Sequence, residues 1–222
     1  MTALILQHGD LGPPGVLGDW AAARGIELEI HHAHSGAPLP ALNGQAFIAS
    51  LGSPHNPADL HIPEVAAELA YVEQAIAREI PVLGLCFGGQ MLAKALGGEI
   101  EKAPQPELGW HTINSAAPDV VPPGPWLQWH FDRFTVPAGA ELLATSAAGP
   151  QAFTHGRHLG VQFHPESTIE IVRSWARSDD ERVRALGIGD GQALLERGRG
   201  HATAAVSAAF DLFDAFWRRT RA

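Results

Sequence analysis

One cysteine, Cys86, stands between two glycines directly after a short apolar run, and this arrangement constrains the fold more than any other feature of the chain. The run Pro81–Leu85 is continuous, which is typical of a central parallel strand that is buried on both faces. The next residues, Gly89–Leu96, have the pattern of a helix. Gly84-x-Cys86-x-Gly88 therefore has the form of the nucleophile elbow G-x-S-x-G, with sulfur in place of oxygen.

The elbow pattern favours a reactive rather than a structural cysteine. A nucleophile on a sharp strand-to-helix turn has strained backbone dihedrals, and glycine neighbours without a Cβ avoid clashes there. The following helix directs its N-terminal amides and the positive end of its dipole at the thiol, which favours the thiolate. The alternative is a small cysteine buried in a strand. Because Cys86 is the only cysteine, it cannot form an internal disulfide, and we expect a reducing, cytoplasmic location.

A thiol nucleophile needs a base, and the best placed of the 12 histidines is His164. Side chains two residues apart on an extended segment project to the same side. Glu166 can therefore hold one imidazole nitrogen of His164 and leave the other for the thiol. The alternative is a strand-terminal histidine beside a solvated glutamate. The order cysteine, histidine, acid argues against the α/β-hydrolase fold, in which the acid precedes the histidine.

Apolar runs alternate with helical patterns in the first hundred residues, which predicts βαβ units. The expected strands there are Ala3–Gln7, Ile26–Ile30, Gln45–Ser50 and Pro81–Leu85, and the expected helices are Val16–Arg24, Glu64–Glu79 and Gly89–Leu96. Further short strands are expected at Leu108–Ile113, Leu127–Phe131, Glu141–Thr145, Gln151–Thr154 and Leu159–Phe163. Residues 167–222 are expected to be mostly helical, with breaks at Gly187, Gly189, Gly191, Gly198 and Gly200.

The chain resembles the class I (triad) glutamine amidotransferases, in particular the glutaminase domain of GMP synthetases, over about residues 3–170. The likeness rests on the elbow, on Gly160–Glu166 and on three shorter segments, which are Leu51-Gly52-Ser53-Pro54, Leu108-Gly109-Trp110 and Trp129-His130-Phe131-Asp132. The resemblance implies an α/β fold with an open, mostly parallel, flavodoxin-like sheet flanked by helices. It also implies glutamine as the substrate and Cys86, His164 and Glu166 as the catalytic triad.

The resemblance implies further site residues. The oxyanion hole would be formed by backbone amides of Phe87 and of Gly52 or Ser53, where Ser53 stands in place of the family's glycine. Gln90 would contact the α-substituents of glutamine. The walls of the substrate pocket would be Trp129, His130, Phe131 and Asp132.

The implied reaction releases ammonia from the glutamine side chain through a cysteinyl thioester. The chain has no G-x-x-x-x-G-K-[ST] loop and too few residues for a synthetase domain, so we expect a separate chain to accept the ammonia. One alternative is a stand-alone γ-glutamyl hydrolase or peptidase. Another is a non-catalytic α/β protein whose cysteine senses oxidation.

Charge and hydropathy argue against two classes of partner. The net charge is −9 and no basic cluster exceeds Arg218-Arg219, so we expect no nucleic-acid binding. The most apolar window, 81–98, is interrupted by Gln90, Lys94 and five glycines, and the N-terminus has no signal-peptide pattern, so we expect no membrane association. We also expect no cofactor.

Histidines gather at His31, His32 and His34, with His55 and His61 further along. Successive strand residues point to opposite faces, so His31 cannot join the other two, and no cysteine or dense acidic cluster adjoins them. We therefore expect a solvated loop beside the active site and no metal site.

Residues 171–222 are expected to form a helical C-terminal extension that packs on the amidotransferase-like domain formed by residues 1–170. Apolar residues recur there at helical spacing, at Ala205, Ala209, Leu212, Phe213, Phe216 and Trp217. Core packing is the expected role of this stripe. The alternative is a docking face for a partner or for a second copy in a homodimer.

Overall fold

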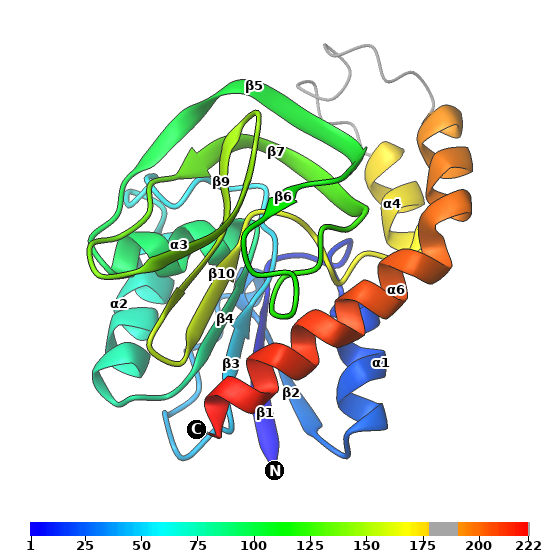
Figure 1. The fold of residues 1–222 in the computed structure, drawn as a ribbon. Coiled ribbons are helices and arrows are strands. Elements are labelled where there is room, and N and C mark those ends of the chain that lie inside the picture. Colours follow the sequence, from blue (N-terminus) through cyan, green and yellow to red (C-terminus); the bar gives the residue numbers. More distant parts are fainter. Residues whose placement is uncertain (178–190, 222) are drawn as a thin grey trace.

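A computed structural model describes residues 1–177 and 191–221 (Figure 1). Its strands are β1 (Thr2–Gln7), β2 (Glu27–His32), β3 (Ile48–Ser50), β4 (Val82–Leu85), β5 (Ile100–His111), β6 (Asn114–Ser115), β7 (Trp126–Phe134), β8 (Glu141–Ser146), β9 (Gly149–His155) and β10 (His158–Val161). Its helices are α1 (Gly15–Ala23), the 3₁₀ helix η1 (Ala33–Ser35), α2 (Pro63–Ala77), α3 (Phe87–Ala95), α4 (Ile169–Ala176) and α6 (Gln192–Thr220).

In the described residues, eight strands form one sheet in the order β2-β1-β3-β4-β10-β9-β8-β6. The strands from β2 to β10 in this order are parallel to one another, whereas β9, β8 and β6 extend the sheet with antiparallel pairing. Strands β5 and β7 form a separate antiparallel pair. This mostly parallel sheet flanked by helices confirms the expected α/β fold class.

Helices cover both faces of the sheet. Successive side chains of a buried strand point to opposite faces, so each face has apolar side chains that a helix must cover. In β1, Ala3 and Ile5 face a core that includes Trp20 of α1 and apolar residues of α6. Leu4 and Leu6 face the opposite core, which they share with α2 and α3. Within the described residues, no helix combines the length and the apolar character that a membrane crossing requires.

Strand β5 is longer than the sequence predicts. The prediction covered only its last residues, from Leu108 to His111, whereas the strand begins at Ile100. Pro104 and Pro106 interrupt the strand pattern before Leu108, and the pairing with β7 shifts register between Lys102 and Glu107. Proline cannot donate to a ladder, so such a segment is recognised as a strand only when its partner is known.

Helix α6 runs through Gly198 and Gly200, so the breaks expected at these two glycines are wrong. Gly191 is the residue before the helix, and Gly187 and Gly189 lie outside the described residues. A glycine within a helix costs only about 1 kcal/mol relative to alanine, which tertiary packing can offset. At Gly198, an added Cβ would lie 2.8 Å from Ile169 Cδ1 and 2.9 Å from Trp110 Nε1, so the glycine permits close packing.

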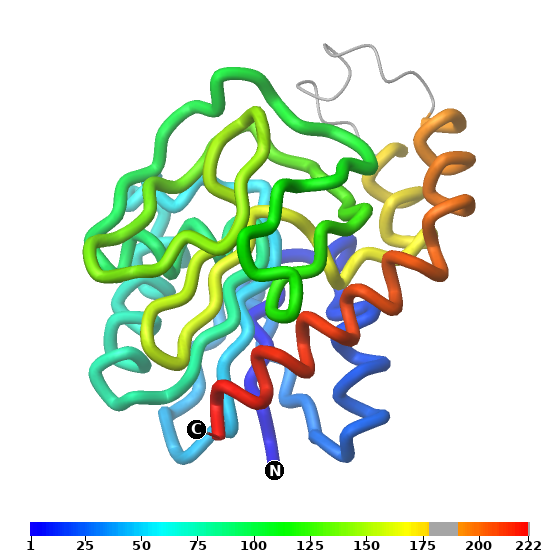
Figure 2. Tube along the Cα trace, viewed as in Figure 1, coloured from blue at the N-terminus to red at the C-terminus, as the bar shows by residue number. Residues whose placement is uncertain are grey.

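Figure 2 shows α6, in orange and red, crossing the molecule diagonally from α4 toward the side of the N-terminus. Leu212, Phe213 and Phe216 are buried in the same core as Trp20. The Trp20 indole N–H also donates to Asp214 Oδ1 at 2.9 Å, between α1 and α6. These contacts confirm core packing for the buried part of the stripe. The domain boundary at residue 170 stays a prediction.

The packing of α6 predicts a large loss of stability for Phe216→Ala. Phe216 is 1% exposed, and removing a buried phenylalanine side chain costs about 3–5 kcal/mol. Val206→Ala is the control on the same helix, because Val206 is 40% exposed and its truncation should change stability by less than about 0.5 kcal/mol. Urea unfolding measures both changes. Equal effects of the two substitutions would contradict the core role of α6.

Candidate active site

The carboxyl ends of four neighbouring parallel strands, β1, β3, β4 and β10, meet at one edge of the sheet. A cavity of about 360 Å³ opens there, and Cys86 and His164 line it. Glu166 is buried and bonded to His164. The cavity is also lined by every residue expected for the oxyanion hole and the substrate pocket, which are Gly52, Ser53, Phe87, Gln90, Trp129, His130, Phe131 and Asp132.

Cys86 occupies a strained turn between β4 and α3. Its backbone has φ 52° and ψ −105°, in the half of the map that side chains with a Cβ rarely adopt. A Cβ on Gly84 would lie 2.3 Å from the carbonyl oxygen of Gly88, and a Cβ on Gly88 would lie 2.0 Å from that of Ser50. Both flanking glycines are thus required by close backbone contacts, as the elbow pattern indicates.

His164 is held by Glu166 and faces Cys86. Its Nδ1 lies 2.8 Å from Glu166 Oε1, and both side chains are 4% exposed. Burial lowers the pKa of His164, but the charges of Cys86 and Glu166, with a hydrogen bond to each, outweigh burial and raise it to about 10. Because a carboxylate only accepts, Nδ1 carries a proton and Nε2 is left for the thiol. Cys86 and Glu166 therefore both favour the protonated imidazole of His164.

Trp175 of α4 packs against His164, a contact that sequence reasoning missed. Its ring meets that of His164 edge to face with centroids 4.7 Å apart, and that of Trp129 at 5.7 Å. The Trp175 indole N–H donates to the carbonyl oxygen of Leu11 at 2.7 Å. The sequence signal that could have indicated this contact is a tryptophan on the helix that follows the His-x-Glu motif.

The segment after β3 lies against the elbow and the histidine. The Gly88 N–H donates to the carbonyl oxygen of Leu51 at 3.2 Å. A Cβ on Gly52 would lie 2.8 Å from His164 Cε1, so only glycine fits there. Ser53 has no positive φ, so serine is accommodated in place of glycine without strain. As the first residue of α3, Phe87 has an N–H without an acceptor inside its own helix.

The expected pocket wall is tied together by hydrogen bonds. Gln90 Nε2 donates to the carbonyl oxygen of Asp132 at 3.1 Å and to Gln162 Oε1 at 3.2 Å. His130 is buried, with Nδ1 2.9 Å from the carbonyl oxygen of Asp132 and Nε2 3.1 Å from Glu107 Oε2. Both ring nitrogens of His130 are therefore used to support the wall.

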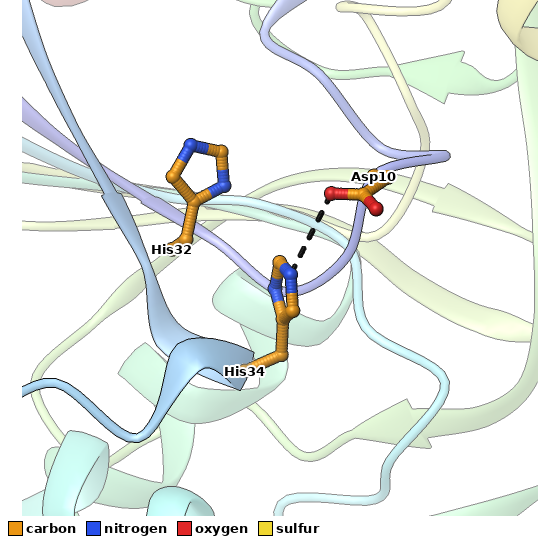
Figure 3. A group of neighbouring side chains, drawn as sticks. All are labelled: Asp10, His32 and His34. Atoms are coloured by element: carbon orange, nitrogen blue, oxygen red, sulfur yellow. Dashed lines mark ion pairs between the residues drawn. The ribbon is translucent and has the colours of Figure 1, made fainter.

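The histidine cluster has a neighbour that sequence reasoning missed. Asp10, in the loop after β1, joins His32 and His34, and one ligand atom from each residue lies within 4.8 Å of the other two. Figure 3 shows the ring of His34 directed at Asp10, with Nε2 3.5 Å from Oδ1. Asp10 also lines the cavity. The acidic group absent from the local sequence is thus supplied from 22 residues before His32.

The raised pKa of His164 predicts that its ring stays protonated at neutral pH and loses its proton only as the pH approaches about 10. Any stability gained from this charge is fully present below pH 6.5, the ordinary histidine value, and is lost as the pH rises toward 10. A ¹⁵N-histidine NMR titration, assigned with His164→Gln, measures the midpoint. Cys86→Ala should lower it, because the interaction with Cys86 is one of the causes that raise the pKa of His164. A wild-type midpoint near 6.5 would contradict a His164 pKa raised by Cys86 and Glu166.

The family model for glutamine amidotransferase class-I matches residues 21–173. The chain is 38% identical to one subunit of the glutamine-hydrolysing GMP synthase of Sulfolobus acidocaldarius over 112 residues, which are 44% of this chain and 60% of that protein. It is 28% identical to the putative glutamine amidotransferase-like protein YfeJ of Salmonella typhimurium over 199 residues, or 82% of this chain and 83% of that protein.

A glutamine amidotransferase from Thermotoga maritima has the same fold, with a TM-score of 0.89 and 23% identity over 100% of this chain and 99% of that one. The matched region spans less than two thirds of the Sulfolobus protein. The family model, however, covers well over half of this chain. The chain therefore belongs to the glutamine amidotransferase class-I family.

Proposed function

We propose that this protein hydrolyses the side-chain amide of glutamine and supplies the ammonia to an acceptor on a separate chain. The observation that carries the proposal is the arrangement of Cys86, His164 and Glu166. The thiol stands on a strained turn in a cavity, facing an imidazole whose other nitrogen is held by a buried carboxylate. This is the arrangement of a nucleophile, a base and an orienting acid that acyl transfer requires.

In the proposed reaction, the Cys86 thiolate attacks the amide carbon of the glutamine side chain. The negative charge that develops on the amide oxygen is stabilised by the N–H groups of Phe87 and Ser53. His164 gives its proton to the leaving nitrogen, so ammonia departs and a γ-glutamyl thioester remains. The neutral imidazole then takes a proton from water, which attacks the thioester and releases glutamate and the thiol.

Gln90 is suited to recognise the backbone end of glutamine. Its Nε2 is already used by Asp132 and Gln162, which fixes the orientation of the amide. Oε1 then remains as an acceptor on the cavity side, and we assign it the α-ammonium group. Trp129, His130, Phe131 and Asp132 form the wall beside it.

The separate acceptor is supported by the relatives. The Sulfolobus relative is named as one of the subunits of a glutamine-hydrolysing GMP synthase. For this chain we propose an ammonia-accepting synthetase partner whose substrate is left open. A glutaminase of this kind can be latent until its partner binds.

Covalent labelling with a glutamine-like diazoketone tests the proposal even in a latent enzyme. The wild type should be alkylated at Cys86, glutamine should protect it, and Cys86→Ala should not be labelled.

Measuring the release of ammonia, glutamate and amine from glutamine and from γ-glutamyl amines separates the alternative functions. Amine release from γ-glutamyl amines with poor turnover of glutamine would contradict the proposal and would indicate a γ-glutamyl hydrolase. No labelling and no turnover, with ready oxidation of Cys86 by peroxide, would favour a redox sensor.

Glu166→Gln should reduce kcat for the hydrolysis of glutamine by about 10²–10⁴-fold, because the neutral amide no longer holds or stabilises the imidazolium. The matched control is Glu170→Gln, an exposed glutamate in the first turn of α4, which should leave kcat unchanged. Steady-state ammonia release measures both variants. Equal rates for Glu166→Gln and the wild type would exclude Glu166 from the triad.

A further inference from the structure

His8 and Glu68 form a second buried imidazole–carboxylate pair beside the cavity. His8 directly follows β1 and lines the cavity, while Glu68 lies on α2, and the two side chains are 6% and 3% exposed. His8 Nε2 bonds to Glu68 Oε2, and Glu68 Oε1 accepts a hydrogen bond of 2.6 Å from Ser50 Oγ. The reaction proposed above uses neither residue.

The other ring nitrogen of His8 reaches the segment after β3. Nδ1 lies 3.2 Å from the carbonyl oxygen of Gly52. Carbonyl and carboxylate oxygens only accept, so both ring nitrogens donate and His8 is an imidazolium. The ring is thus fixed between α2 and the Gly52 carbonyl.

This contact determines the orientation of one peptide unit. The carbonyl of Gly52 and the N–H of Ser53 belong to the same planar trans peptide, so they point in opposite directions. Glycine gives this unit more freedom to rotate than any other residue would. We propose that His8, held by Glu68, is a positioning residue that keeps the Gly52 carbonyl turned to itself and the Ser53 N–H turned to the oxyanion. The inference rests on the proposed function.

Two substitutions separate positioning from packing. His8→Leu removes both donors, whereas His8→Asn places an amide nitrogen near the position of Nδ1 and retains the bond to Gly52. For glutamine hydrolysis, His8→Leu should lower kcat by about 10–10²-fold with KM little changed, because an oxyanion donor is misaligned rather than removed. His8→Asn should recover most of this loss. Alkylation of Cys86 by iodoacetamide has no oxyanion and should be equal in all three proteins.

Crystal structures supply a readout that does not depend on activity. In His8→Leu the Gly52 carbonyl should leave its wild-type direction, and in His8→Asn it should keep it. An unchanged kcat or an unchanged carbonyl in His8→Leu would overturn the inference, as would a parallel loss of iodoacetamide alkylation. If the wild type neither hydrolyses glutamine nor reacts with the diazoketone, the proposed function fails, and the two structures still decide the role of His8.

Asp10, His32 and His34 form a cluster of possible metal ligands beside the cavity. We infer that this cluster binds one divalent transition-metal ion of the zinc type, for which imidazole and carboxylate are suitable ligands. Metal–ligand bonds of about 2.0–2.2 Å require the three ligand atoms to approach more closely than 4.8 Å. Asp10 and His34 are 88% and 42% exposed, so small side-chain rotations achieve this and water completes the shell.

Metal binding here would connect two segments at the entrance to the cavity. His32 and His34 belong to the end of β2 and to η1, whereas Asp10 belongs to the loop that lines the cavity. An ion would therefore fasten this loop to the edge of the sheet.

Calorimetric titration with Zn²⁺ tests the site in a Cys86→Ala background, which removes the thiol as a competing ligand. One equivalent should bind, and adding either Asp10→Asn or the pair His32→Ala and His34→Ala should weaken binding by at least about tenfold. His61→Ala, at an exposed histidine outside the cluster, is the control and should have no effect. Equal affinity in the cluster variants, or no binding in the background protein, would overturn the inference.

Discussion

The position of the thiol depends on the close contact of the elbow with the two strands beside β4. Gly88 lies against the backbone of Ser50 in β3, and Gly89 lies against that of Val161 in β10, where an added Cβ would come within 2.2 Å of the carbonyl oxygen. Such contacts stabilise the positive φ of Cys86, a backbone conformation that costs about 1–3 kcal/mol. A side chain on either glycine would push α3 away from the sheet and would move the sulfur away from His164.

The rest of the fold supports the imidazole side of the site. The backbone N–H of His164 donates to the carbonyl oxygen of Leu127 in β7, and the carbonyl oxygen of Glu166 accepts from the Val16 N–H at the start of α1. Trp175 of α4 packs edge to face against the imidazole of His164. Helix α6 in turn contacts α4. The C-terminal helix therefore contributes to the site although none of its residues lines the cavity.

Local patterns predicted the strands that carry the site and the residues Cys86, His164 and Glu166, because each motif combines a chemical residue type with a spacing set by one strand or one turn. No local sequence pattern predicts the contacts between segments that are far apart in the sequence. His8 meets Glu68 across 60 residues, and Asp10 meets the histidines from a separate loop. The part of β5 before Leu108 was not predicted because of its prolines, and the glycines of α6 were interpreted as helix breaks, because in both places tertiary packing outweighs the local preference.

In the proposed reaction, Cys86 carries the γ-glutamyl group during turnover. Rapid mixing of the wild-type protein with glutamine, an acid quench and mass spectrometry of the Cys86 peptide measure this directly. We expect a γ-glutamyl adduct on that peptide, sensitive to hydroxylamine as a thioester is, and absent from Cys86→Ala. Ammonia release in steady turnover with no adduct on Cys86, or with the adduct on another residue, would contradict it.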